Sequence, residues 1–392
     1  MLTRLRPITT AAVAVTVVLG LTACSGTDSS SAPGPTSGAA SGTTSTPDTG
    51  AAGSDQDGAD EPIAFGRTAD SAGWPSCAHL LPGGLVEAVV PGVDVEDPLT
   101  GQAHTLGAWA FTPAAGGASC WATNGVSTLD DVAEARRDDP VFQGVHVSVL
   151  PDATPEFRAA GGNDAAGASM STTEVRCDAT DAARVQCQGG VLAGDAWVDV
   201  TAVRAQDSAA ATPEAVLPAF RTLLGHVQQD VATSAGASVS TGHAAASSRL
   251  TVCDSSRVDD VSDVDLSTPS DVATDTAAEL GDFAMHRVEG AACVFRYDGS
   301  GRYPLTGAAY SELPDGGWVL EQRLGNGTVD RSGRLDLDGL ESGDAAWRTC
   351  DDMLCSVDVL RDGTWEHFAL WRAVAPDTTS AIVRWVEASL AA

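Results

Sequence analysis

The chain contains no lysine, so its 22 basic residues are all arginine. This absence excludes chemistry that depends on a lysine side chain, including the P-loop, Schiff-base enzymes and the Ser-x-x-Lys acyl-transferases. The chain also has no CxxC pair, no His-x-x-x-His pair and no Gly-x-Ser-x-Gly turn. Those motifs are typical of zinc sites and serine hydrolases. We therefore expect neither an enzyme nor a bound metal or other cofactor.

Positive charge is scarce, because 53 acidic residues face 22 arginines and the net charge is −31. A chain of this charge repels nucleic acid and anionic wall polymers. A neutral or cationic ligand is easier to accommodate, although acidity also serves solubility in a secreted protein. We therefore expect no nucleic-acid partner.

Residues 1–23 have the pattern of a secretory signal. Arg4 and Arg6 precede an apolar segment, and Leu21-Thr22-Ala23-Cys24 then follows the pattern of a lipobox. The sequence predicts cleavage before Cys24, acylation of this cysteine and anchoring of the mature chain at the outer face of the cytoplasmic membrane. The alternative is an uncleaved signal anchor with an incidental cysteine.

Residues 24–62 are almost entirely Ser, Gly, Thr, Ala, Pro and Asp, with no aromatic residue. Such a composition cannot form a hydrophobic core, so we expect a disordered tether after the lipidated Cys24.

The other eight cysteines fall into two sets of four with a similar rhythm, which suits a compartment where disulfides persist. Four cysteines permit three pairings, and we favour the first with the second and the third with the fourth. The predicted pairs are Cys77–Cys120, Cys177–Cys187, Cys253–Cys293 and Cys350–Cys355. Zinc is the alternative for clustered cysteines, but it needs thiolates, which an oxidising location disfavours.

Two stretches align without a gap, Cys187–Ala205 and Cys355–Ala373, and share Trp197/Trp365 among other identities. Each predicts a β-hairpin, with a two-residue turn at Gly194-Asp195 or Asp362-Gly363. The hairpin repeat and the cysteine rhythm together predict two tandem domains.

We place the first domain at 63–231, a linker at 232–248 and the second domain at 249–392. Strands in series with helices at both ends predict an α+β fold, in which each domain is an antiparallel sheet with helices packed on one face and two disulfides. The expected elements include a helix over 78–90 that is broken at Pro82 and by glycines, helices from Thr212 and over 378–390, and strands over 145–150, 291–297 and 318–324.

A Pro75-Ser76-Cys77 step before a helix and Ser119-Cys120-Trp121 at a strand start, following a lipobox and tether, resemble the actinobacterial envelope lipoproteins of the mycobacterial LpqN-like group. The resemblance implies a Mog1/PsbP-type fold and a binding or sensing role, with no catalytic residues. In the second copy Val252-Cys253 and Val294 depart from the motif. The extracellular sensor domains of mycobacterial-type serine/threonine kinases are a second resemblance with the same implication.

The second strand of the C-terminal hairpin offers a candidate ligand platform. Alternation with period two places Trp365, His367 and Trp371 on one face, and Phe368 and Leu370 on the face expected to contact helices. If the first of these faces is open, it can bind a sugar, a lipid or a peptide. Alternatively, the tryptophans pack between the domains or under a loop.

We therefore expect a membrane-anchored, extracytoplasmic binding or sensing module of the cell envelope, with the second domain as the binder. Its ligand would be a small molecule, a lipid, a sugar or an envelope protein. The alternatives are a scaffold for another envelope protein, which an exposed apolar patch would reveal, or a cell-wall hydrolase.

Overall fold

A computed structural model describes residues 63–66, 73–96, 108–125, 142–160, 175–179, 184–206, 211–234, 255–264, 266–271, 280–297 and 305–391. The predicted signal, Cys24 and the tether lie outside these residues, as does the predicted linker beyond Ser234. Residues 59–392 form one compact unit. No helix of the described part has the length and apolarity needed to cross a membrane.

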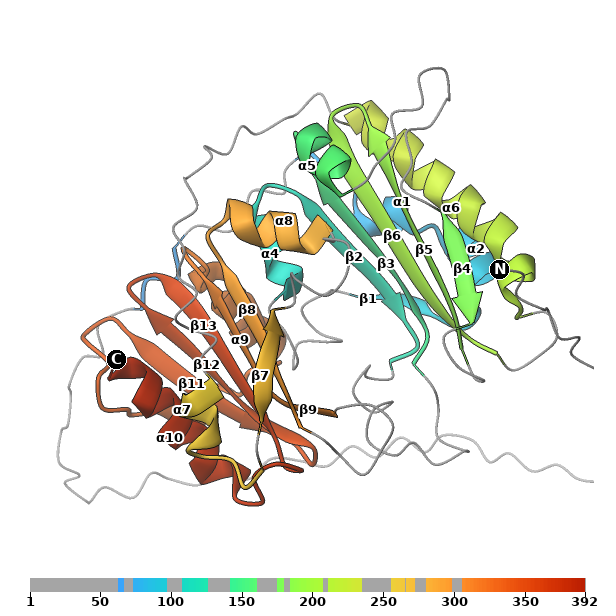
Figure 1. Ribbon diagram of the computed structural model, residues 1–392. Coiled ribbons are helices and arrows are strands. Elements are labelled where there is room, and N and C mark those ends of the chain that lie inside the picture. The colour runs from blue at the N-terminus through green and yellow to red at the C-terminus, as the bar shows by residue number, and fades with distance from the viewer. Residues whose placement is uncertain are drawn as a thin grey trace, which may run out of the picture. The chain divides into compact units, whose positions relative to one another are not determined.

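The first half of this unit, residues 73–234, contains a six-stranded antiparallel sheet in the order β1-β2-β3-β6-β5-β4 (Figure 1). Its strands are β1 (Asp94–Glu96), β2 (Ala118–Thr123), β3 (Gly144–Leu150), β4 (Arg176–Ala179), β5 (Arg184–Ala193) and β6 (Ala196–Ala205). Its helices are α1 (Cys77–Leu80), α2 (Gly83–Val89), α4 (Ala108–Ala114), α5 (Thr154–Ala159) and α6 (Pro213–Ser234). We call this half the first repeat.

The second repeat, residues 255–391, contains a seven-stranded antiparallel sheet in the order β10-β11-β12-β13-β9-β8-β7. Its strands are β7 (Ser267–Asp271), β8 (Ala291–Tyr297), β9 (Leu305–Leu313), β10 (Arg334–Leu335), β11 (Ala345–Cys350), β12 (Leu354–Arg361) and β13 (Thr364–Trp371). Its helices are α7 (Ser255–Asp259), α8 (Leu280–Arg287), α9 (Gly317–Asn326), the 3-10 turn η2 (Arg331–Gly333) and α10 (Thr378–Leu390).

The two sheets have the same topology. Reading the second from β7, each strand takes the place of its first-repeat counterpart, and β10 is an additional edge strand. The hairpins also share a register, because Leu192 faces Trp197 as Leu360 faces Trp365. The prediction of an α+β chain with two antiparallel sheets is confirmed.

One face of each sheet packs against the long C-terminal helix of its repeat. Figure 1 shows α6 lying along the first sheet and α10 along the second. The helix predicted from Thr212 is α6, which buries one apolar face that includes Phe220, Leu224 and Val227, and α10 has the predicted bounds. Phe368 and Leu370 face α10, where they pack with Ile382 and Trp385. These aliphatic and aromatic contacts form the core of each repeat.

The expectation that helices cover one face of each sheet is wrong, because α9 packs on the face opposite α10. The reason is that this second face is also apolar at one end, where Leu313, Leu360 and Trp365 are fully buried. An apolar surface on both sides of a sheet needs a cover on both sides.

The strand predicted over 318–324 is also wrong, because these residues belong to α9. The positions that the helix buries include Leu320 and Leu324, four residues apart, which is helical and not strand spacing. Gly327 adopts a positive φ of 82° and ends the helix.

A shared hydrophobic cluster joins the two repeats. It includes Phe157 and Trp197 from the first and Trp318 and Trp365 from the second. The Trp197 ring lies 5.6 Å from the ring of Phe283 on α8. Equivalent positions of the two repeats thus contribute to one core.

Disulfides connect Cys77 to Cys120, Cys177 to Cys187 and Cys350 to Cys355, as predicted. Cys293 is also disulfide-bonded. Its predicted partner, Cys253, lies outside the described residues.

Candidate functional site

Three polar groups occupy the sheets. Two are buried in the second repeat, one on each face of its sheet. The third is half-exposed and lies in the first repeat, on the face opposite α6.

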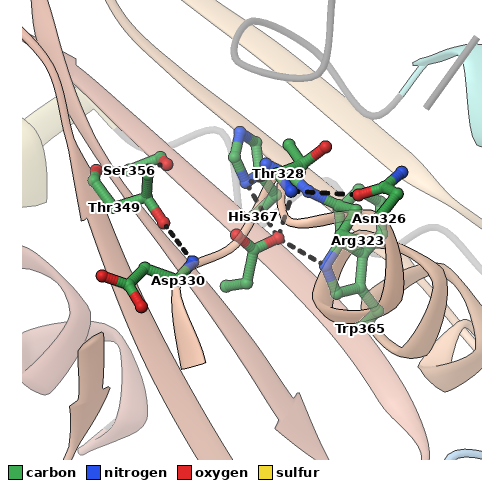
Figure 2. Close-up of polar contacts among 9 residues, drawn as sticks. Arg323, Asn326, Thr328, Asp330, Thr349, Ser356, Trp365 and His367 are labelled. Carbon is green, nitrogen blue, oxygen red and sulfur yellow. Dashed lines mark hydrogen bonds and ion pairs between the residues drawn. The ribbon is translucent and has the colours of Figure 1, made fainter. Parts of the chain in front are cut away.

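The first group is a buried charge cluster formed by Arg323 of α9, Asp358 of β12 and His367 of β13 (Figure 2). Asp358 Oδ1 lies 3.1 Å from Arg323 Nη1 and 3.2 Å from His367 Nδ1. The same oxygen accepts a 2.9 Å hydrogen bond from Trp365 Nε1. The side chains of Arg323 and Asp358 are 0% exposed and that of His367 is 1% exposed.

Sheet register and the fold of α9 build this cluster. Asp358 and His367 face each other directly across the β12–β13 pair, so their side chains leave the sheet on the same side. Arg323 lies on the buried stripe of α9 with Leu320 and Leu324 and therefore points toward the sheet.

Burial and charge act in opposite directions on Asp358. Burial alone would raise the pKa of this carboxyl group, but Arg323, His367 and the hydrogen bonds from His367 and Trp365 lower the pKa to about 2. Burial lowers the pKa of Arg323, and Asp358 opposes this effect. The carboxylate and guanidinium therefore remain a charged pair at neutral pH.

Several polar atoms of the cluster have no hydrogen-bond partner within the described residues. They are Arg323 Nε and Nη2, Asp358 Oδ2 and His367 Nε2, and none of them is reached by solvent. A His–Asp pair acts as a general base only when a substrate proton can reach the free ring nitrogen. Because Nε2 of His367 is enclosed, it is closed to a substrate, and the cluster connects α9 to the sheet through the ion pair of Arg323 and Asp358.

The second group lies on the α10 side of the same sheet. Tyr310 Oη lies 3.2 Å from Glu312 Oε2 and 3.2 Å from Glu366 Oε2, and all three side chains are buried. Arg361 Nη2 is 3.2 Å from the other Glu366 oxygen. Burial first, and then the nearby Glu312, raise the pKa of Glu366, while Arg361 opposes the rise. Glu366 therefore holds its proton to a higher pH than an ordinary carboxyl group, but neither Glu366 nor Glu312 is open to a substrate.

The third group is a row of side chains directly opposite one another on four neighbouring strands of the first sheet. We call it the aromatic row: Trp121 of β2, His146 of β3, Thr201 of β6 and Gln188 of β5. All four side chains are half-buried. The rings of Trp121 and His146 are stacked, with centroids 4.0 Å apart and 17° between their planes.

Two serine hydroxyl groups hold the histidine of this row. His146 Nε2 lies 3.0 Å from Ser119 Oγ and 3.1 Å from Ser148 Oγ, and both serines are buried. Burial lowers the pKa of His146 to about 4, so the ring is neutral at physiological pH. The row can therefore offer aromatic surface, a hydroxyl group and an amide to a ligand without a charge.

The predicted ligand platform is not open. Trp365 is 0% exposed, His367 is 1% exposed and Trp371 is 7% exposed. The predicted alternation of faces is confirmed, but α9 covers Trp365 and His367, and Trp371 packs with Leu354 and Ala369. The alternative that the tryptophans pack between the domains fits Trp365, which belongs to the cluster shared by the two repeats.

Sequence reasoning missed Arg323, Asp358 and the aromatic row. One signal was available for the helix that carries Arg323. Leu313-Pro314-Asp315 repeats Leu150-Pro151-Asp152, and a helix follows each of these triplets. The aromatic row could have been found from Trp121 and His146, since both lie in predicted strands.

Among the described residues, no group of three or more His, Cys, Asp or Glu side chains is arranged to hold a metal ion. A pocket of about 550 Å³ lies beside β10 and the following loop, and it is lined by Ile63 and by residues of the segment 334–345. Comparison with known proteins finds no matching protein family, no matching curated protein and no matching solved structure.

Proposed function

We propose that this chain is a lipid-anchored extracytoplasmic protein of the cell envelope whose two repeats form a non-enzymatic binding module. The observation that carries the proposal is that every described cysteine is disulfide-bonded. Disulfides persist in oxidising compartments, and the lipobox at Cys24 leads the chain to such a compartment. Membership of the LpqN-like lipoprotein group is part of the same proposal and rests on the motifs around Cys77 and Cys120.

The charge clusters favour binding over catalysis as the role of the module. The titratable groups best placed for acid–base chemistry, His367 with Asp358 and Glu366 with Glu312, are buried in the second repeat. The side chains that solvent reaches on the first sheet include the neutral ones of the aromatic row, with Asp199 beside Thr201 on the same face. A ligand therefore meets hydrogen-bonding and aromatic groups before it meets a catalytic group.

A scaffold for another envelope protein is the second candidate. An apolar docking surface would support it, but Val95 of β1 is the one large hydrophobic side chain that is exposed among the described residues. Isolated exposed residues of this kind are normal on a protein surface. The described surface thus favours a polar ligand.

Anchoring is tested by replacing Cys24 with alanine in the native host. The wild-type chain should incorporate labelled palmitate and sediment with membranes, and Cys24→Ala should lose both properties while its disulfides still form. A matched change of the next residue, Ser25→Ala, should leave both properties intact. Equal labelling of wild type and Cys24→Ala would contradict the proposed anchor.

A further inference from the structure

We propose that the aromatic row of the first sheet binds a neutral carbohydrate. This inference rests on the proposed function, because it names the ligand class and the site of the binding module. Three properties of the row carry it: solvent reaches the row, the row has no charge, and its side chains combine aromatic surface with hydrogen-bonding groups.

The row is accessible where its counterpart in the second repeat is closed. The equivalent positions, aligned by the same strand register, are Val294, Ala309, Ala369 and Ser356. All four of these are buried, with exposed fractions between 0% and 7%. In the first repeat all four positions are half-buried and carry larger or more polar side chains. The same face of the same fold therefore has a reachable polar surface in one repeat and a closed small-residue surface in the other.

The charge of the site disfavours an anionic ligand. None of the four side chains is charged at neutral pH, because His146 stays unprotonated. Where the row continues onto β4, Arg176 lies 3.4 Å from Asp178 and the two form an ion pair. An anion would be repelled by a chain of net charge −31 and by the acidic residues next to the row, Glu96 opposite Trp121 on β1 and Asp199 two residues from Thr201 on β6.

The chemistry of the row matches a sugar ring. The stacked Trp121 and His146 present aromatic surface, against which the C–H face of a pyranose or furanose packs. Thr201 adds a hydroxyl group and Gln188 adds an amide with two donors and one acceptor, which suits ligand hydroxyl groups. An acyl chain would need a continuous aliphatic surface, whereas three of these four side chains, His146, Thr201 and Gln188, carry polar groups.

The site is also held in place before a ligand arrives. The row lies on four adjacent strands, and the buried hydroxyls of Ser119 and Ser148 fix the ring of His146, on which Trp121 stacks. A rigid site loses less conformational entropy on binding.

The test uses the full-length lipidated protein in a detergent that is not a glycoside. Soluble oligomers of β-1,4-linked N-acetylglucosamine, galactose, arabinose, mannose and α-linked glucose are titrated by calorimetry, together with a sulfated glycan and a free fatty acid. We expect at least one neutral oligomer to bind and the two charged probes not to bind at this site. Trp121→Ala should abolish the binding.

Because loss of a tryptophan can disturb the fold, a second variant combines Thr201→Val with Gln188→Ala, two half-exposed positions. It should weaken the binding by about tenfold or more through the loss of two hydrogen bonds. Gln322→Ala, at a half-buried glutamine of α9 in the second repeat, is the matched control and should bind as wild type does.

The inference is overturned if no neutral oligomer binds, if the double variant binds as well as wild type, or if a charged probe binds in a manner that depends on the row. Palmitate labelling of Cys24 is independent of these titrations. Failure of sugar binding with intact labelling therefore removes the ligand assignment alone, and failure of labelling removes the proposed anchor.

Discussion

The two repeats carry side chains of different chemistry at equivalent positions of their sheets. Where the second repeat has Asp358 facing His367, the first has Gly190 facing Asp199. Where the first has Trp121 facing His146, the second has Val294 facing Ala309. The duplicated fold thus keeps a charge cluster inside one copy and a reachable neutral row on the other. For the proposed binding module, this difference favours the first repeat as the binder, whereas the sequence pattern predicts the second, whose platform residues Trp365 and His367 are buried.

The sheet faces that contact α6 and α10 also differ, and the acidic side chains are again buried in the second repeat. The positions of Glu312 and Glu366 in the second sheet correspond to Val149 and Val198 in the first, which face each other and are fully buried. The first repeat therefore has an aliphatic core at this position, and the second has a pair of carboxylates bridged by Tyr310.

The largest expected effect comes from breaking the charge cluster of the second repeat. Arg323→Met should lower the free energy of unfolding by about 3–5 kcal/mol, because Asp358 is left buried without its ionic partner. Arg158→Met, at an exposed arginine of the equivalent helix α5, is the control and should change the free energy of unfolding by less than about 1 kcal/mol. Chemical denaturation measures both.

The cause is tested by removing the second charge as well. Arg323→Met combined with Asp358→Asn should lose less stability than Arg323→Met alone, because no unpaired charge then remains in the core. A double variant that is less stable than the single variant would show that Trp365 and His367 stabilise the Asp358 carboxylate even without Arg323, and would contradict this cause.

Acid should destabilise the two repeats in different pH windows. The pKa of His146 is about 4 in the folded chain against 6.5 when unfolded, so the unfolded chain binds the proton more readily. Its contribution is complete above pH 6.5 and is lost as the pH falls to 4, which amounts to at most about 3 kcal/mol. His146→Gln should flatten this window of the stability curve measured by denaturation.

The contribution of Asp358 to stability is lost at a lower pH than that of His146. Its folded pKa of about 2 lies below the ordinary 3.8, so its stabilising contribution is present above pH 3.8 and is lost as the pH falls toward 2. Burial raises the pKa of Glu366, so the stability that Glu366 contributes is present at low pH and is lost as the pH rises through its folded pKa.

A stability curve of His146→Gln that runs parallel to the wild-type curve between pH 6.5 and 4 would contradict the assignment of this window to His146 of the first repeat.

A smaller effect separates the two equivalent tryptophans. Trp365 Nε1 donates to Asp358, while Trp197 Nε1 has no partner within the described residues. Trp365→Phe should therefore cost more stability than Trp197→Phe by about 1.5–3 kcal/mol, the usual value of a hydrogen bond to a charged group. Both changes remove similar ring volume, so each serves as the control for the other. Equal losses would mean that the bond to Asp358 adds nothing.

Local sequence patterns predicted the parts of the fold that local chemistry determines. The apolar face of α6, the bounds of α10 and both hairpins follow from residue spacing and turn residues. The strand predicted over 318–324 failed because its apolar residues are too dense to distinguish a short buried helix from a strand.

The candidate sites were harder to predict, since they depend on contacts distant in the sequence. Asp358 is one of 53 acidic residues, and nothing near it in the sequence identifies Arg323 as its partner. Alternation correctly placed Trp365 and His367 on one face, but alternation cannot show whether a helix covers that face. The cover depends on the packing of α9, whose sequence pattern predicts a strand.

Hydroxyl-radical footprinting of the native protein, read by mass spectrometry at single tryptophans, tests the division between the repeats most directly. We expect Trp121 to be oxidised readily and Trp365 and Trp371 to be protected, and we expect a bound neutral oligosaccharide to protect Trp121 alone. Oxidation of Trp365 and Trp371 as fast as Trp121, or protection of these two by the sugar, would contradict this division.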